Sequence, residues 1–254
     1  MCTRQAYLRL LLVAMALAVA TLTGCGGGHL ISQSQEIDMG KKAGDQFERE
    51  NGGRDADPAI NALVQTVATR ITAAAKPPDY PYDVRVLASK QINAVAFPGG
   101  RIYLFRGLID NFDRNPDQLA WVLAHETTHV AHRHAVKQTE QQLGYEAIIA
   151  LIFNKGDAPQ IAGAVANLAL LGYGRDEELE ADQYGLVFAH AAGYDPTASI
   201  GVLQGFQKIQ GKQPNNFEIM LSTHPGDNTR IDHVKSYLQT QGWRGQYFTP
   251  TGGG

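Results

Sequence analysis

The sequence has few cysteines and no excess of basic residues. Cys2 and Cys25 are its only cysteines among 254 residues, which excludes a disulfide-stapled scaffold. With 22 Lys and Arg against 25 Asp and Glu, the formal net charge is −3, so the chain lacks the basic stripe that binds nucleic acid, and we expect no such partner. Glycine follows no regular period, and no apolar run after residue 25 is long enough to span a bilayer.

The chain does contain enough apolar residues for a buried core. The hydrophobic fraction is 44% and the charged fraction is 19%, which is typical of a globular domain and not of a disordered chain. A chain of this length fits one domain. We place that domain at residues 33–245 and expect a disordered tail at 246–254.

The first 24 residues have the pattern of an export signal. A short basic segment precedes the apolar stretch Leu10–Leu22, which is too short to span a membrane but typical of a signal peptide. The stretch ends in Leu22-Thr23-Gly24-Cys25, which resembles the lipobox of bacterial lipoproteins. This resemblance implies cleavage before Cys25 and a lipid on its sulfur, with residues 25–32 as a flexible tether. A plain secretory signal with an incidental cysteine is the alternative.

The residue after Cys25 bears on the membrane that such an anchor would reach. The residue that follows the cysteine is Gly26 and not an aspartate. The resemblance to sorted lipoproteins then implies the outer membrane, contacted through the lipid on Cys25. We therefore expect the folded domain on the periplasmic face of that membrane.

The hydrophobic pattern predicts a mainly helical α+β fold with a small β-sheet. Apolar residues recur at helical spacing within 33–76, and a break from Asn51 to Pro58 divides this stretch into two helices. Three short segments predict strands, and a turn at 98–100 joins the last two into a hairpin: 82–87, 93–97 and 101–105. Further helices are predicted from residue 115 onward, over 148–153, 161–171 and 176–192, after Pro196, and over 228–241.

The most specific motif is His125-Glu126-Thr127-Thr128-His129, on the helix predicted from residue 115. Two histidines four residues apart lie about 40° apart around a helix, so both imidazoles reach one metal ion. Glu126 lies beside them, in position to take a proton from a metal-bound water. Zinc suits this task because it lowers the pKa of the water to about 7 and polarises a carbonyl. The motif therefore predicts one catalytic Zn²⁺ per chain.

A catalytic zinc needs a third protein ligand. The metzincin pattern requires glycine at 132 and histidine at 135, but the chain has His132 and Ala135, which excludes that pattern. The acidic segment Arg175–Asp182 is the best source of a carboxylate from a later helix. Glu178 and Asp182 share one helical face, so Glu178 would bind the metal while Asp182 orients a ligating histidine. Spacing alone does not choose among three acidic residues: Glu177, Glu178 and Glu180.

Four stretches resemble the zinc metallopeptidases (gluzincins) that include the CAAX prenyl endopeptidase, the heat-shock protease HtpX and periplasmic lipoprotein proteases. They span about residues 93 to 231 and are Asn93–Gly100, His125–His129 with His134, Arg175–Asp182, and Thr223-His224-Pro225 with Arg230. The match of Arg175–Asp182 to R-x-x-E-x-x-A-D implies Glu178 as the third ligand. The chain lacks the transmembrane helices of the first two proteins, so the resemblance implies the small lipoprotein branch and argues against a CAAX substrate.

The resemblance also implies that His224 and Arg230 face the zinc site and act in catalysis beside Glu126. His224 would stabilise the oxyanion of the tetrahedral intermediate or cap the zinc as a fourth ligand, and both roles stay open here. Arg230 would hold the substrate or the developing charge. We expect His134 to pack behind a ligand and His132 to have a surface role.

These features together predict a zinc endopeptidase. A substrate peptide would add as an extended strand to Ala94-Val95-Ala96-Phe97, or to 103–105. The resemblance implies misfolded or damaged envelope proteins as substrates, and envelope assembly machinery is a further expected partner. The alternative is a chaperone or binding lipoprotein that keeps zinc without proteolysis. The intact Glu126 argues against it, because a structural zinc site has no use for that base.

Overall fold

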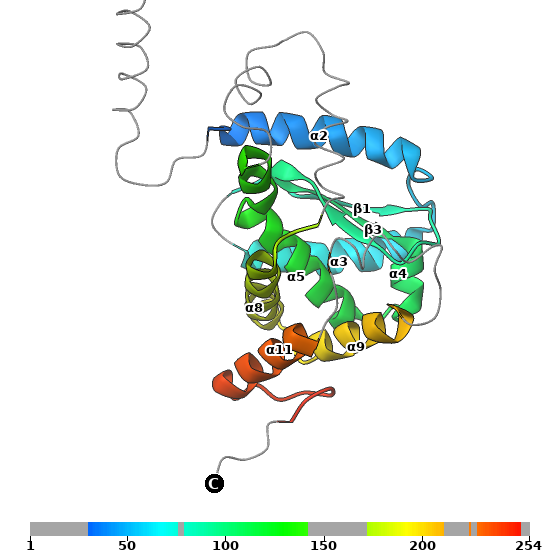
Figure 1. Ribbon diagram of the computed structural model, residues 1–254. Helices are drawn as coiled ribbons and strands as arrows, with labels where there is room; N and C mark the ends of the chain where they lie inside the picture. Colours follow the sequence, from blue (N-terminus) through cyan, green and yellow to red (C-terminus); the bar gives the residue numbers. More distant parts are fainter. Residues whose placement is uncertain (1–29, 76–78, 142–171, 211–223, 225–227, 250–254) are drawn as a thin grey trace, which may run out of the picture. The chain divides into compact units, whose positions relative to one another are not determined.

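A three-stranded sheet separates one helix from the other helices of the domain in the computed structural model (Figure 1). The structure describes residues 30–75, 79–141, 172–210, 224 and 228–249. The predicted signal peptide and the predicted helices at 148–153 and 161–171 lie outside these residues. Among the helices that are described, none has the length and apolar character needed to cross a membrane.

The sheet is mixed, with the strand order β1-β3-β2. Strand β3 (Arg101–Phe105) pairs in parallel with β1 (Asp83–Leu87) and antiparallel with β2 (Ala94–Ala96). The 3-10 turn η1 (Pro98–Gly100) joins β2 to β3, so the predicted hairpin is present. Strand β2 lies at one edge, and no other described strand pairs with its outer side.

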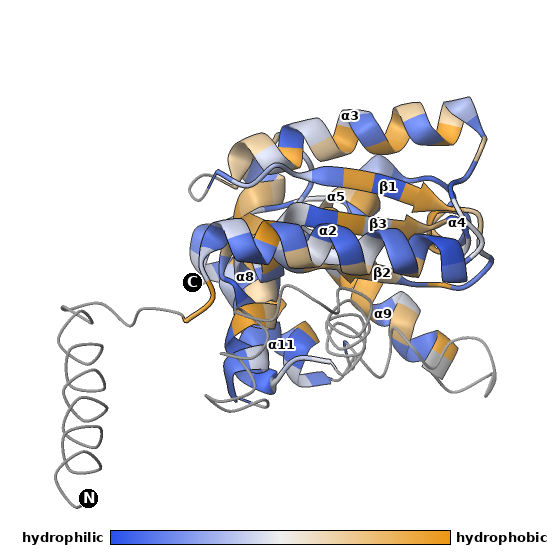
Figure 2. Cartoon of the chain, turned by 90° about the horizontal axis from the view of Figure 1, so that it is seen from above, coloured by the Kyte–Doolittle hydropathy of each residue, from blue (hydrophilic) through white to orange (hydrophobic). Residues whose placement is uncertain are grey.

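Successive side chains of each strand point to opposite faces of the sheet, and both faces are apolar. One face packs with Ala43 and Phe47 of α2 (Gln33–Glu50) in a small core. The residues on this face are Leu87, Val95, Tyr103 and Phe105 of the strands, with Phe97 just after β2. The other face packs on α3 (Pro58–Ala74) and α5 (Pro116–Ala131) in the main core. Its strand residues are Val84, Val86, Ala94, Ala96, Ile102 and Leu104. The sheet is thus buried on both sides, and the outward surface of α2 is largely hydrophilic (Figure 2).

Helix α2 holds the turn that follows the edge strand. It begins at Ser32, whose hydroxyl and Gln35 form a capping box. A Cβ on Gly40 would clash with the carbonyl oxygen of Pro98, so only glycine permits this close approach. The buried carboxylate of Glu36 accepts a hydrogen bond from Gly99 N at 3.3 Å. The end of β2 is therefore fixed against α2.

Helix α5 runs through the centre of the main core. Asn115 caps its first turn, and Pro116 occupies the first helical position. Every residue from Leu119 to Val130 is buried, so this part of the helix exposes little surface to solvent. It packs against α3, β2, α8 (Arg175–Ala191) and α9 (Ala198–Gln210).

Two further helices are α4 (Arg106–Asn111) and α11 (Asn228–Gln241), and residues 134–141 are also helical up to the limit of that described range. The predicted fold class, mainly helical with a small sheet, is confirmed. After α11, Gly245 and Phe248 form an isolated bridge, and Gln246 N donates to Asp195 Oδ2 at 2.9 Å. Residues 246–249 of the predicted tail are thus described, and 250–254 lie outside the described residues.

Candidate active site

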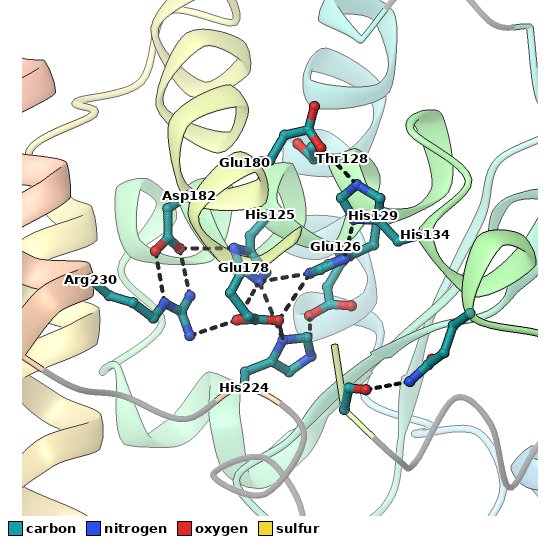
Figure 3. Close-up of polar contacts among 12 residues, drawn as sticks. His125, Glu126, Thr128, His129, His134, Glu178, Glu180, Asp182, His224 and Arg230 are labelled. Carbon is teal, nitrogen blue, oxygen red and sulfur yellow. Dashed lines mark hydrogen bonds and ion pairs between the residues drawn. The ribbon is translucent and has the colours of Figure 1, made fainter. Parts of the chain in front are cut away.

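The predicted site residues come from four separate parts of the chain (Figure 3). The histidines and Glu126 of the HExxH motif lie in the C-terminal half of α5, and the acidic segment forms the start of α8. Helix α8 packs along α5 more extensively than any other pair of described elements. His224 follows α9 in the chain, and Arg230 lies in the first turn of α11.

Four buried side chains converge on one point: His125, His129, Glu178 and His224. The Nε2 atoms of His125 and His129 are 3.0 Å apart. The carboxylate of Glu178 lies 3.6 Å from His125 Nε2 and 3.5 Å from His129 Nε2. His224 Nδ1 lies 3.3 Å from His125 Nε2 and 2.8 Å from Glu178 Oε1.

This arrangement fits a zinc ion. Ligand atoms about 2.0–2.1 Å from a tetrahedral zinc lie about 3.3 Å from one another, and the donor separations here are between 2.8 and 3.6 Å. Burial holds the pKa of His129 well below its usual value, so its imidazole is neutral, as a metal ligand must be. Burial opposes ionisation of Glu178, but the adjacent His224 imidazole and the Arg230 guanidinium hold its pKa well below the usual range.

Glu126 has no hydrogen-bond donor among the described residues. Both of its carboxylate oxygens are buried without such a partner, and His224 Nε2 lies 3.4 Å from Oε1. A buried carboxylate without a donor is costly. This side chain is therefore poised to accept a proton or a hydrogen bond from a group bound at the four converging donors.

Arg230 holds the two buried carboxylates of α8. Its Nη1 lies 2.7 Å from Glu178 Oε2, and its Nε lies 2.7 Å from Asp182 Oδ2. Burial raises the pKa of Asp182, but Arg230 outweighs this and lowers it. His125 Nδ1 lies 3.1 Å from Asp182 Oδ1, where the predicted orienting role requires it. Arg230, predicted to hold substrate or developing charge, is thus engaged with Glu178 and Asp182.

The structure separates the three acidic candidates for the third ligand. Only Glu178 reaches the converging histidines. The carboxylate of Glu177 lies 3.3 Å from Lys137 Nζ. Glu180 instead contacts His132 and His134 at 2.9 and 3.1 Å. Glu177 and Glu180, which the spacing had left open as third ligands, therefore contact other residues instead.

Sequence reasoning did not single out Tyr173. Its half-buried ring stacks on His129 with centroids 3.9 Å apart and 12° between the planes. Tyr173 and His129 also line a narrow crevice with Ala96, Phe97 and Pro98. The end of the predicted substrate strand therefore lies beside a residue of the HExxH motif. The only sequence signal for Tyr173 is its position between two glycines just before the acidic helix.

The fold and site define a metallopeptidase of the HExxH type with a downstream glutamate. The model for Peptidase family M48 matches residues 58–238, a range that contains every residue of the converging group. The chain belongs to this family.

Curated relatives of the chain are proteases. This chain is 30% identical to the beta-barrel assembly-enhancing protease of Yersinia pestis, over 84% of its own length and 46% of that protein. It is 29% identical to the mitochondrial metalloendopeptidase OMA1 of Schizosaccharomyces pombe over 69% of this chain and 52% of that protein. The chain thus spans about half the length of the relatives that it matches.

We predict that Glu178→Gln weakens zinc binding, while Glu177→Gln does not. The amide that this substitution places at position 178 is neutral and a poor zinc ligand, whereas Glu177 contacts Lys137 outside the site. Elemental analysis after dialysis against a weak chelator measures the zinc retained by each variant. Equal zinc retention in the two variants would contradict the ligand assignment.

Proposed function

We propose that this protein is a zinc-dependent endopeptidase that cleaves misfolded or damaged proteins of the bacterial envelope. The observation that carries the proposal is the buried Glu126 carboxylate, which has no donor among the described residues and lies beside four converging metal-ligand atoms. A site built only to bind zinc for stability has no need of such a base. Membership of a peptidase family supports the same reading.

Each residue of the site then has a chemical role. His125, His129 and Glu178 would hold Zn²⁺, which supplies an activated water and polarises the scissile carbonyl. Glu126 accepts a proton from the attacking water at a carboxylate oxygen and returns it to the leaving amine nitrogen. Arg230 keeps Glu178 ionised and in place through their ion pair.

Strand β2 offers a binding edge for the substrate. Its outer side is unpaired among the described strands, and its end lines the same crevice as His129. An extended peptide added to this edge would form backbone hydrogen bonds and run past the site. We propose that Ala94–Phe97 bind substrate in this way.

His224 occupies the place of a fourth ligand. Its Nδ1 belongs to the converging group, with 2.8 Å to Glu178 Oε1 and 3.3 Å to His125 Nε2. An oxyanion donor would instead point at the space that the substrate carbonyl fills. The geometry therefore favours His224 as a cap on the resting site, which must leave before substrate binds.

The envelope substrates and partners are inferred from the relatives and the N-terminal sequence. One relative is named as a beta-barrel assembly-enhancing protease. This supports unfolded envelope proteins as substrates, and envelope assembly machinery as a partner. The lipobox-like sequence ending at Cys25 supports attachment to the outer membrane, with the domain on its periplasmic face.

We predict that Glu126→Gln abolishes casein cleavage and retains one zinc per chain. Loss of the base should lower the rate about 10²–10⁴-fold, because the amide cannot take the proton. Cleavage by the wild-type protein should stop with a chelator and return with zinc. Wild-type protein that contains zinc but degrades no unfolded substrate would favour the chaperone alternative. In cells, envelope proteins that accumulate with Glu126→Gln identify the substrates.

We predict that His224→Ala raises basal peptide cleavage, because the substitution frees the position that the attacking water needs. Initial rates on a fluorogenic peptide compare this variant with wild type. His190→Ala, which removes a ring stacked on Trp243, serves as the control and should leave the rate unchanged. A drop of about 10²–10³ with zinc retained would instead assign His224 to the oxyanion.

We predict that Cys25→Ser prevents lipid attachment, because serine offers no thiol for the diacylglycerol. Labelling with a radioactive fatty acid and fractionation of the membranes measure the effect. The variant should lack the label and leave the outer membrane fraction. Label retained on Cys25→Ser would exclude Cys25 as the lipid site.

A further inference from the structure

A chain of polar contacts leads from His129 to the protein surface. His129 Nδ1 lies 2.8 Å from His134 Nδ1. His134 Nε2 lies 3.1 Å from Glu180 Oε2, and Glu180 Oε1 lies 2.9 Å from His132 Nδ1. His134 is buried, whereas the side chain of Glu180 is 42% exposed. His134 was expected to pack behind a ligand, but none of the roles described above uses its contact with Glu180.

The proton positions along this chain follow from the role of His129. If Nε2 of His129 binds the metal, its Nδ1 carries the proton and donates to His134 Nδ1. His134, accepting at Nδ1, carries its own proton on Nε2 when neutral. That N–H then donates to the carboxylate of Glu180, which accepts only when ionised or through its carbonyl oxygen. With Glu180 ionised, this arrangement of protons satisfies each contact from His129 to Glu180.

The two ligating histidines are thus supported in different ways. His125 Nδ1 faces the carboxylate of Asp182 directly. The Nδ1 atom of His129 reaches a carboxylate, that of Glu180 on α8, through His134.

We propose that His134 and Glu180 are positioning residues that fix the orientation and tautomer of His129 for metal binding. The inference rests on the zinc site of the proposed function and adds Glu180, a partly exposed residue, as the acceptor that holds His134 in place. Neither residue belongs to the converging group that would hold the metal. Both act through the imidazole of His129.

The same three outer residues also lie close enough together to suggest a metal site of their own: His132, His134 and Glu180. The proton positions argue against this. A metal at His134 Nε2 would need the nitrogen whose proton Glu180 accepts. The neutral His134 would then carry its proton on Nδ1 and could no longer accept from His129.

The test measures the zinc affinity of the purified chain by competition with a chromogenic chelator. His134→Ala and Glu180→Ala should weaken zinc binding about 10–100-fold. Glu180→Gln should keep most of the affinity, because its amide oxygen accepts the same hydrogen bond. Glu177→Ala is the matched control, since it removes an acidic side chain of the same helix that pairs with Lys137, and it should leave the affinity unchanged.

Two further measurements separate positioning from other effects. Thermal unfolding of the metal-free chains should coincide for wild type and Glu180→Ala, because Glu180 is half exposed. With cobalt in place of zinc, the visible absorption band should shift in His134→Ala, since the imidazole of His129 is no longer fixed.

Three results would overturn the proposal. They are unchanged zinc affinity in Glu180→Ala, an equal loss in Glu177→Ala, or a second zinc in the wild type that Glu180→Ala removes. Failure of the proposed function is a separate result. A wild-type chain that cleaves no protein, yet needs Glu180 for tight zinc binding, would refute the peptidase activity and support the positioning role.

Discussion

The packing of α8 along α5 is the contact on which the site depends. It places Glu178 and Asp182 beside the imidazoles of the HExxH motif, away from solvent. Two buried carboxylates are costly unless a positive charge compensates them. Arg230 of α11 supplies that charge by contacting both. Arg230 therefore helps to fix the direction in which the Glu178 carboxylate points.

A second constraint joins the substrate edge to this site. Gly40 lets α2 approach the turn after β2, and Glu36 accepts from the backbone of that turn. Glu36 also accepts from Arg133 Nε at 2.9 Å, just after α5 ends. One buried carboxylate thus links the turn after the edge strand to the end of the active-site helix. Helix α2 thus fixes the position of the substrate-binding edge relative to the helix that carries the metal ligands.

Local patterns in the sequence determined much of the fold and the centre of the site. Helical spacing and turn residues predicted two helices within 33–76 and the hairpin at 93–105, as the structure has them. His125 and His129 were predicted as partners because positions four apart share one face of any helix. Such relations depend only on neighbours along the chain. For Glu178, the family resemblance rather than the spacing made the choice.

The tertiary structure decided the relations between helices. The rotation of α8 about its axis turns Glu178 toward the histidines of α5 and places Glu180 in contact with His134. The spacing of residues within one helix does not reveal this rotation. Arg230 was expected to face the zinc site and hold the substrate or the developing charge, and the docking of α11 places its guanidinium on two carboxylates. Tyr173 carried no motif at all. Its stacking on His129 exists only because distant segments meet in a packed core.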